Sequence, residues 1–211
     1  MLTLLTLLGH NEMGIIERRL RQKEEVRNDI ISTAWDMVKK DGWQALSIRK
    51  IADAIEYSVP VIYDHFENKE AILLEFGKKG FRKLADKIEK AKDQYTDPAD
   101  QIRAIADAYW DFALNNTELY QLMFGIGMAS CESDKCTFEY ERFTDIMMEP
   151  IEKQLELNKR TDVSCCLKYH TFWSMMHGMI SIKINGNSPA DSELNKMVLD
   201  DAINGYIKNL D

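Results

Sequence analysis

Apolar residues recur every three or four positions along most of this chain, the spacing that places them on one face of an α-helix. No stretch forms a convincing β-strand pattern. Glycine and proline are few, at 10 and 4 residues, which also favours long helices. Breaks in the pattern predict about nine helices, over residues 15–40, 48–55, 59–66, 69–94, 98–114, 118–128, 138–157, 163–184 and 191–210. We therefore predict an all-α fold.

The most informative stretch is residues 47–70, whose pattern predicts two short helices joined by a tight turn and the start of a third helix. The first helix has an apolar stripe at i, i+3, i+4 and i+7, formed by Ile48, Ile51, Ala52 and Ile55. Three polar residues stand where N-caps are expected: Ser47, Ser58 and Asn68. In the second helix Ile62 and Phe66 should face inward. Two such helices form the helix-turn-helix unit that presents a helix to the DNA major groove.

This stretch resembles the DNA-binding domain of the TetR family of transcriptional regulators, whose pattern runs roughly Ile-Ala, turn, Ser, then Leu-Tyr-x-His-Phe-x-x-Lys. The matching positions are Ile51-Ala52, Ser58 and the block Ile62-Tyr63-Asp64-His65-Phe66-Glu67-Asn68-Lys69. Three residues depart from the pattern. Glu56 stands where the family usually has glycine in the turn, and Val61 stands where it often has threonine. Asp64 adds a negative charge near the expected DNA contacts. Since a non-glycine residue in the left-handed conformation costs roughly 1 kcal/mol, the turn should either tolerate that strain or differ slightly.

The resemblance implies a three-helix DNA-binding domain over residues 13–70 and a set of DNA contacts within it. The implied contact residues are Ser47, Arg49, Lys50, Ser58, Val59, Pro60, Val61, Tyr63, His65 and Lys69. Arg49 should reach a base edge, and Val59 and Pro60 should offer apolar contact to base methyl groups. Phosphates should be held by Ser47, Tyr63, His65 and Lys69.

Ahead of this domain the chain opens on a short apolar run, and residues 1–12 form a separate segment in our division. The run is too short to span a bilayer and lacks the basic start and small-residue cleavage site of a secretory signal. We expect it to come from an upstream start choice or to form an extra N-terminal helical turn that packs locally. The helix that follows carries basic residues at Arg18, Arg19, Arg21, Lys23 and Arg27, interleaved with glutamates. They form either a solvated face with i, i+4 ion pairs or an arm that touches DNA.

Residues 71–211 are expected to form a helical effector-binding and dimerisation domain that is rich in aromatic residues and methionine. Within it, Trp173-x-x-x-His177-Gly178 and the run from Glu118 to Gly125 are similar to the TetR C-terminal subfamily named after its Trp-His-Gly (WHG) motif. Trp173 and His177 should share a helix face, and Gly178 should permit close helix approach. The predicted apolar effector pocket comprises Tyr109, Tyr120, Phe124, Phe143, Met147, Tyr169, Trp173 and His177. The alternative for His177 is a hydrogen-bonded core histidine.

The last two predicted helices carry more apolar surface than one thin domain could cover. The helix over residues 163–184 is apolar nearly all round, which predicts burial on more than one side. The last helix has an apolar stripe that comprises Leu194, Met197, Val198, Ala202, Ile203, Tyr206 and Ile207. Both helices can pair with a second copy. The TetR resemblance likewise implies a homodimer through these helices, which would set two DNA-reading units about one helical turn apart on a palindromic double-stranded operator.

Composition narrows the functional classes. The 211 residues have a mean hydropathy of −0.36, a value expected for a soluble protein. Their net charge of −8 disfavours nonspecific nucleic-acid binding by the whole surface. The cysteines, Cys131, Cys136, Cys165 and Cys166, follow no standard zinc spacing and are expected to be reduced thiols in the cytoplasm. No phosphate loop or nucleophile elbow is present. We expect no enzyme activity, no cofactor, no metal and no membrane partner.

We therefore predict a cytoplasmic homodimeric TetR-type regulator that binds DNA by sequence, a repressor released by a small apolar effector. One alternative is a helical regulator that responds to a partner protein or to thiol oxidation. Another is an all-α small-molecule-binding protein without a DNA target.

Overall fold

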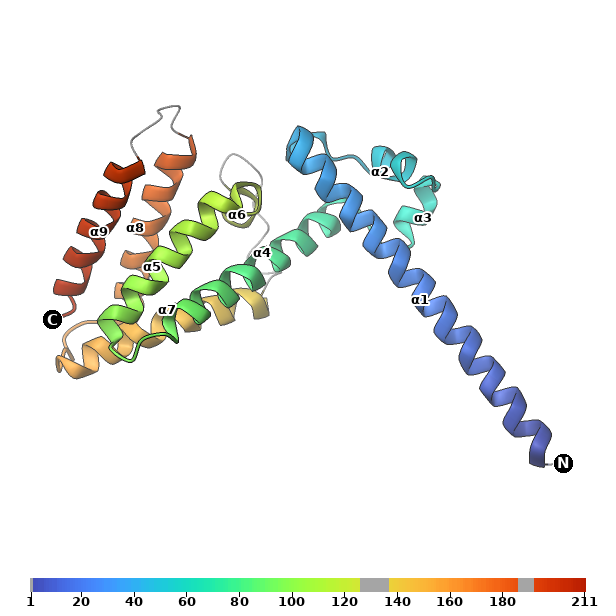
Figure 1. The fold of residues 1–211 in the computed structure, drawn as a ribbon, viewed down its shortest axis with the longest axis horizontal. Coiled ribbons are helices and arrows are strands. Elements are labelled where there is room, and N and C mark those ends of the chain that lie inside the picture. The colour runs from blue at the N-terminus through green and yellow to red at the C-terminus, as the bar shows by residue number, and fades with distance from the viewer. Residues whose placement is uncertain (1, 126–136, 186–191) are drawn as a thin grey trace. The chain divides into compact units, whose positions relative to one another are not determined.

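The computed structural model describes residues 2–125, 137–185 and 192–211, and all the regular structure of these residues is helical (Figure 1). Nine α-helices and one short 3₁₀ helix are present in the described ranges, which confirms the predicted all-α fold. The chain divides into two compact units, Met1–Ile72 and Leu73–Asp211, here called the head and the body.

The head contains α1 (Leu2–Asp41), a 3₁₀ turn (Trp43–Ala45), α2 (Ile48–Ala54), α3 (Val59–Tyr63) and the first residues of α4 (Lys69–Lys92). Its buried side chains are Val26, Ile30, Ala34, Val38, Trp43, Leu46, Ile51, Ala52, Ile62, Phe66 and Ile72. The inward orientation predicted for Ile62 and Phe66 is thus confirmed.

The first helix is longer than its apolar pattern predicted. α1 begins at Leu2, not near residue 15, so residues 2–12 continue the helix and form no separate turn. Its end is as predicted, since Gly42 follows with a φ of 77°, a conformation that glycine adopts without strain. Asn68 caps α4 as expected, with its Oδ1 accepting from the Ala71 N–H at 2.8 Å.

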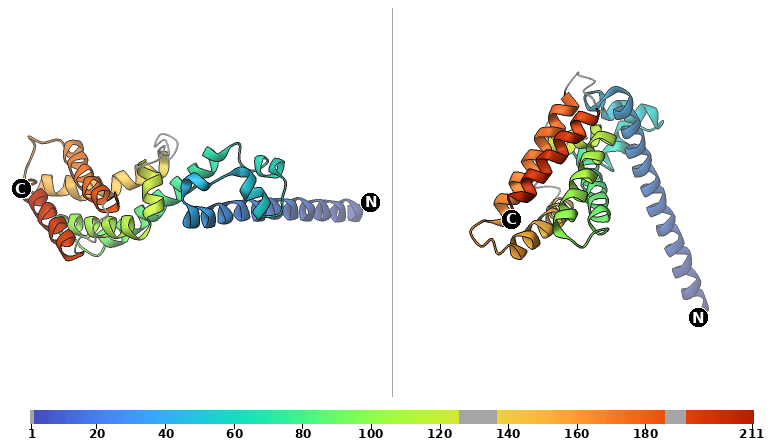
Figure 2. Two further views of the ribbon diagram at one scale, coloured as in Figure 1. Left: turned by 90° about the horizontal axis from the view of Figure 1, so that it is seen from above. Right: turned by 60° about the vertical axis from the view of Figure 1, so that its left-hand side comes forward.

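The body contains the rest of α4 and five further helices: α5 (Pro98–Asn115), α6 (Thr117–Phe124), α7 (Thr137–Leu157), α8 (Cys165–Asn185) and α9 (Ser192–Lys208). Asp97 caps α5, accepting from the N–H groups of Ala99 and Asp100 at 2.9 and 3.1 Å. α6 ends at Gly125, which has a φ of 67°. α5 contacts α6, α7, α8 and α9, so it forms the centre of this unit (Figures 1 and 2).

The outer faces of α8 and α9 differ from the prediction. α8 is not buried on more than one side within the chain, since Leu167 and Ile182 are 61% and 76% exposed. In α9 the predicted stripe divides in two. Ile203, Tyr206 and Ile207 pack inside with Leu199 and Leu210, whereas the upstream part is exposed: Leu194, Met197 and Val198. These five exposed residues, Leu167, Ile182, Leu194, Met197 and Val198, are here called the α8–α9 apolar face.

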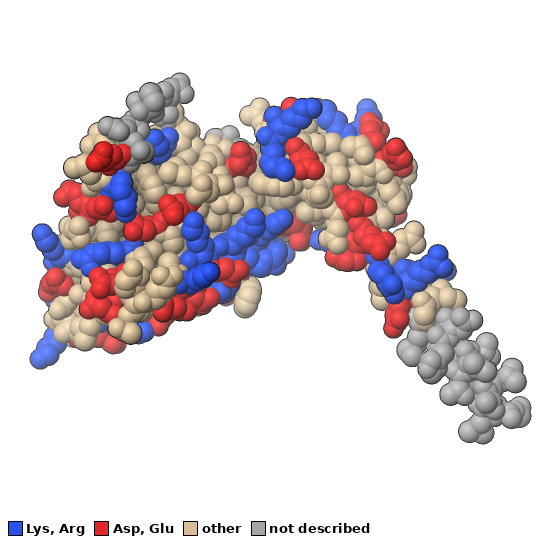
Figure 3. Space-filling model, viewed as in Figure 1, with Lys and Arg blue, Asp and Glu red and all other residues tan. Residues whose placement is uncertain are grey.

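No helix in the described part of the chain is both long and apolar enough to cross a bilayer. On the visible face of the body, basic side chains gather along α4, with acidic side chains beside them (Figure 3).

Candidate nucleic-acid interface and effector site

The turn between α2 and α3 closes the helix-turn-helix unit with a Schellman motif. The Tyr57 N–H donates to the Ala52 carbonyl at 3.0 Å and the Glu56 N–H to the Asp53 carbonyl at 3.4 Å. Glu56 has a φ of 59°, the left-handed conformation in which the family usually has glycine. The turn therefore keeps the expected geometry and tolerates the strain of a side chain.

α3 is held to the head by its inner face and leaves its other side chains outside. Ile62 is fully buried, whereas Tyr63 is 53% exposed. Of the ten predicted DNA-contact residues, the exposed ones are Arg49, Lys50, Ser58, Pro60 and Tyr63, and the half-buried ones are Ser47, Val59, Val61, His65 and Lys69. Neither Ser47 nor Ser58 uses its hydroxyl as a cap, although both occupy the N-cap position. Both hydroxyls are therefore free of that intrahelical role.

Arg27 was grouped with the basic arm in the sequence, but it packs within the head. Its guanidinium lies 4.3 Å from the centre of the Phe66 ring and donates to the His65 carbonyl at 3.1 Å. Arg27 therefore fixes α1 to the connection between α3 and α4, a role that the sequence did not indicate, and the DNA contact of the arm stays a prediction. Nothing in the sequence separated it from Arg18, Arg19, Arg21 and Lys23, which are exposed.

His65 and Lys69 lie at the edge of this contact. Burial, together with Lys23 and Arg27, lowers the pKa of His65, so its ring is neutral at neutral pH. Its Nδ1 atom is buried without a hydrogen-bond partner among the described residues. Lys69 Nζ is 3.5 Å from the Trp43 carbonyl oxygen. Tyr57, 42% exposed beside the turn, is a further candidate contact that the sequence pattern did not single out.

In the body, six of the eight predicted effector residues form one connected set of ring contacts. We call this set the ring cluster: Tyr109, Tyr120, Phe124, Phe143, Trp173 and His177. They come from α5, α6, α7 and α8. Phe124 is central, since its ring centre lies 4.7 Å from Tyr120, 5.2 Å from His177 and 6.1 Å from Trp173.

The other two predicted residues lie outside these ring contacts. Tyr169 is buried and its hydroxyl lies 3.4 Å from Thr144 Oγ1. Met147 is buried. Trp173 and His177 do share a helix face, stacked with ring centres 5.3 Å apart, as predicted. The close approach predicted at Gly178 is absent within the described residues, because a Cβ there would meet no atom within 4 Å.

A chain of polar groups runs through the ring cluster. The hydroxyls of Tyr109 and Tyr120 are 3.2 Å apart, and the Tyr120 hydroxyl is 2.8 Å from His177 Nδ1. Burial raises the pKa of both tyrosines and lowers that of His177, so all three groups are uncharged at neutral pH. The Trp173 Nε1–H is buried without a hydrogen-bond partner among the described residues.

The ring cluster is tied to α4 by a close contact. A Cβ at Gly80 would lie 2.8 Å from Met123 Cγ on α6 and still nearer to its Sδ, so any larger residue at this position requires Met123 or one of the two helices to shift. The next residue, Phe81, packs edge-on against Phe124 with ring centres 5.6 Å apart. Hence a displacement of α6 that carries Tyr120 and Phe124 must be accommodated by α4.

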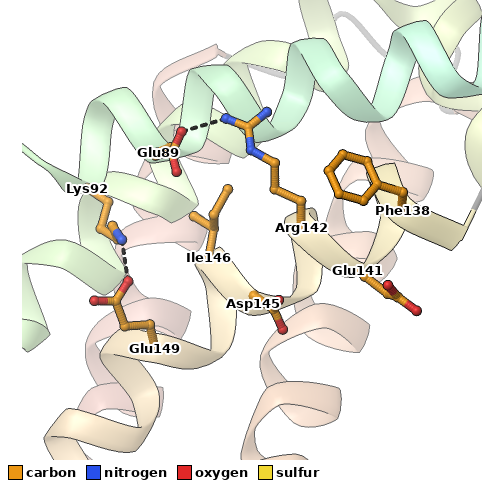
Figure 4. Close-up of a pocket in the computed structure, with 8 residues that line it drawn as sticks. All are labelled: Glu89, Lys92, Phe138, Glu141, Arg142, Asp145, Ile146 and Glu149. Atoms are coloured by element: carbon orange, nitrogen blue, oxygen red, sulfur yellow. Dashed lines mark hydrogen bonds and ion pairs between the residues drawn. The ribbon is translucent and has the colours of Figure 1, made fainter.

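A groove of about 570 Å³ lies between α4 and α7 (Figure 4), and none of the predicted effector residues lines it. Arg142 crosses it to Asp86 at 2.6 Å and to Glu89 at 2.5 Å, and Lys92 pairs with Glu149. Four acidic and two basic residues line it: Glu89, Glu141, Asp145, Glu149, Lys92 and Arg142. Because its basic groups are already paired, the groove disfavours an anionic ligand and serves as an ion-pair seam.

The thiols offer no metal site in the described ranges. Burial raises the pKa of Cys165, so its thiolate is scarce at neutral pH, whereas Cys166 is exposed. Cys131 and Cys136 lie outside the described residues. In those that are described, no three His, Cys, Asp or Glu side chains lie together in a metal-binding arrangement.

Comparison with known proteins gives matches to both units. Residues 30–76 match the family model described as "Bacterial regulatory proteins, tetR family", and residues 102–202 match "Tetracyclin repressor-like, C-terminal domain". The similarity to the WHG subfamily stays a prediction. A curated relative, the HTH-type transcriptional activator FasR of Mycolicibacterium smegmatis, is 28% identical over 102 residues, 48% of this chain and 47% of that protein. The match thus spans about half the length of the relative.

Two solved structures share the fold over most of the chain. FadR from Bacillus subtilis, in complex with stearoyl-CoA, is 14% identical with a TM-score of 0.65, over 86% of this chain and 96% of that one. AibR, in complex with isovaleryl coenzyme A and operator DNA, is 15% identical with a TM-score of 0.61, over 85% and 96%. With one TetR-type match on the helix-turn-helix and another on the helical body, the chain belongs to the TetR family of DNA-binding transcriptional regulators.

Proposed function

We propose that this regulator acts as a homodimer on a palindromic operator and that a small effector with an apolar acyl chain lowers its affinity for DNA. The observation that carries the proposal is the link from the ring cluster to α4. Gly80 and Phe81 of α4 pack directly against α6, which supplies Tyr120 and Phe124. An effector that rearranges these rings therefore acts on the helix whose first turn belongs to the head.

The DNA contacts follow from the exposed side of the helix-turn-helix. Arg49 reads a base edge and Lys50 lies beside it, while the exposed Pro60 and half-buried Val59 approach base methyl groups. The phosphates are held by Ser47, Ser58, Tyr63, His65 and Lys69. Since His65 is neutral, it contributes a hydrogen bond and no charge. Lys69 is the contact that lowers affinity on every sequence when it is removed.

The α8–α9 apolar face supports the dimer. Its five large apolar side chains are between 49% and 76% exposed, although they lie on two helices that contact each other. Removing such a face from water stabilises association by about 25 cal/mol per Å² of apolar area. A second copy, related by a two-fold axis, would offer the same face in return.

The acyl class of effector is supported by the ring cluster and by the two structures above. Both of those proteins were crystallised with an acyl thioester of coenzyme A, one short and one long. Met123, Met147 and Met176 are buried on α6, α7 and α8, three of the helices that supply the ring cluster. Such a site suits an apolar chain, because methionine repacks around irregular ligands. The rings are packed against one another in this structure, so the effector has to part them.

The sign of regulation is proposed as repression with release by the effector. A relative named as an activator matches about half of this chain. The reporter experiment must therefore be able to show either repression or activation. Binding must favour the DNA-incompetent state, and a tenfold preference supplies only about 1.4 kcal/mol. Useful induction therefore needs a larger preference.

The test has two stages. DNA bound by the purified protein is first selected from a random pool, and we expect a palindrome whose half-sites are about one helical turn apart. Stearoyl-CoA and isovaleryl-CoA are then titrated into the complex, with free coenzyme A as the control, and a reporter gene under the selected operator gives the sign. Absence of any selected sequence would contradict the DNA contacts, and retention of the complex with both thioesters would contradict the effector class.

A further inference from the structure

The three polar groups inside the ring cluster form a chain whose protons can be assigned. Tyr109 from α5, Tyr120 from α6 and His177 from α8 follow one another at 3.2 and 2.8 Å. Each hydroxyl has a single proton, and the neutral imidazole also has one. The buried Tyr120 hydroxyl has no other hydrogen-bond partner among the described residues, so its proton goes to Tyr109 or to His177. The chain therefore runs from Tyr109 towards His177, or the reverse.

The surroundings of Tyr109 decide between them. Its hydroxyl is fully buried, and the partner described for it is the Tyr120 hydroxyl. In the reverse direction the buried Tyr109 proton would have no acceptor among the described residues, and an unsatisfied buried donor is costly. Tyr109 therefore donates to Tyr120, and Tyr120 donates to His177 Nδ1.

This direction fixes the state of His177. Because Nδ1 accepts a hydrogen bond, the single proton of the neutral ring is on Nε2. Burial keeps the ring neutral by lowering its pKa. The ring is held in place by stacking on Trp173 at 5.3 Å and by the edge contact with Phe124 at 5.2 Å. None of the hydrogen bonds found among the described residues uses Nε2.

We infer that His177 presents a fixed Nε2–H donor beside the apolar cluster and that it selects effectors with a hydrogen-bond acceptor at the head of the chain. Under the proposed function, on which this step rests, the acceptor is the carbonyl oxygen of an acyl thioester. The Tyr109–Tyr120 pair acts through His177: it sets the tautomer and touches no part of the effector. An apolar chain without a carbonyl, or one headed only by a donor, finds no matching group.

The tautomer is tested without any effector. Long-range ¹H–¹⁵N correlation spectra of the full-length protein, labelled at histidine nitrogen, separate the two neutral tautomers, and His177→Gln identifies the signal. We expect the Nε2–H form in the wild type and a mixture of tautomers in Tyr120→Phe. Tyr206→Phe removes a buried hydroxyl bonded to the Lys168 carbonyl, outside the chain, and should leave the signal unchanged. An Nδ1–H form in the wild type would overturn the inference.

The acceptor is tested with a matched pair of ligands. Stearoyl-CoA and its thioether analogue S-octadecyl-CoA differ only in the carbonyl group. We expect the wild type to prefer the thioester by about five- to tenfold in Kd, the factor that one buried neutral hydrogen bond supplies. His177→Phe should lose this preference, whereas His177→Gln, which retains an N–H donor, should keep most of it.

The outcomes separate the two levels of proposal. Equal affinity for the two ligands in the wild type would overturn the carbonyl contact and leave the acyl effector in place. Failure of both ligands to bind would overturn the effector class and the carbonyl contact with it. A preference that survives in His177→Phe would place the donor on another residue.

Discussion

The contact of Gly80 with Met123 gives the sharpest quantitative prediction. Replacing Gly80 by alanine puts a Cβ 2.8 Å from Met123 Cγ, whereas carbon atoms in ordinary contact are about 3.5–4.0 Å apart. Met123 is 3% exposed, so its side chain cannot swing into solvent to make room. Either α4 and α6 separate or Met123 takes a poorer rotamer.

Two opposing effects set the magnitude. Alanine in the middle of a helix is favoured over glycine by about 0.8–1.0 kcal/mol. Overpacking a buried site costs about 1–3 kcal/mol. Gly80→Ala should therefore change the free energy of unfolding by roughly 0–2 kcal/mol in the destabilising direction, about 2–4 °C in Tm for each kcal/mol at this chain length.

A double-mutant cycle isolates the contact from the helix propensity. Met123→Ala removes the obstructing atoms and on its own should cost about 2–5 kcal/mol. In that background Gly80→Ala meets no methionine side chain and should stabilise the protein by about 1 kcal/mol, so the coupling energy is about 1–3 kcal/mol. Urea unfolding followed by circular dichroism measures all four proteins. If Gly80→Ala has the same effect with Met123 and with Ala at this position, the close approach of α4 and α6 is not as described.

Four further predictions concern other parts of the molecule. Glu56→Gly relieves a left-handed residue and should raise the free energy of unfolding by up to about 1 kcal/mol, less the added chain entropy, as measured by urea unfolding. Val198→Glu places a charge on the α8–α9 apolar face and should yield monomers in sedimentation, with much weaker operator affinity. A wild type that is monomeric at micromolar concentration would contradict a dimer interface at this face. Lys69→Ala should weaken binding to every DNA sequence and flatten the salt dependence by about one unit, whereas Arg49→Ala should relax preference at one base position. Since the folded-state pKa of His177 is lowered, the unfolded chain gains its proton first as the pH falls through about 6.5. Stability is then lost on acidification, and His177→Gln should remove that part of the loss in urea titrations at pH 7.5 and 5.5.

Local sequence patterns predicted the head well because its elements depend on neighbours in sequence. Ile62 and Phe66 stand four residues apart and must share a face, and Asn68 caps α4 with an oxygen three residues away. Even the unusual Glu56 was located by its place in the motif. The role of Arg27 depends instead on a contact 38 residues away in sequence, and periodicity holds no information on such contacts.

The body was predicted less completely for the same reason. The sequence pattern of an apolar residue on α9 is the same whether the residue packs inside the chain or is exposed to a partner. Val198 and Ile203 were therefore placed on one stripe, although only Ile203 is buried. Close helix approach was assigned to Gly178, which has no neighbouring atom, whereas Gly80 has atoms of another helix against it. Which glycine lies at a crossing is set by how the helices meet, and that is decided by the whole core.

Because α3 is so short, the residue that holds it in the fold is distinct from the residues that we propose to contact DNA. Folding stability and the choice of operator are therefore separable. Five residues are too few to form a helix alone, so α3 exists because Ile62 docks it on the head. Ser58, Pro60 and Tyr63 are exposed and add little to that docking. Substitutions there can accumulate with little effect on folding free energy. A lineage can therefore drift from one operator to another through a series of folded intermediates, and a laboratory library confined to these positions should remain folded while it explores new DNA sequences.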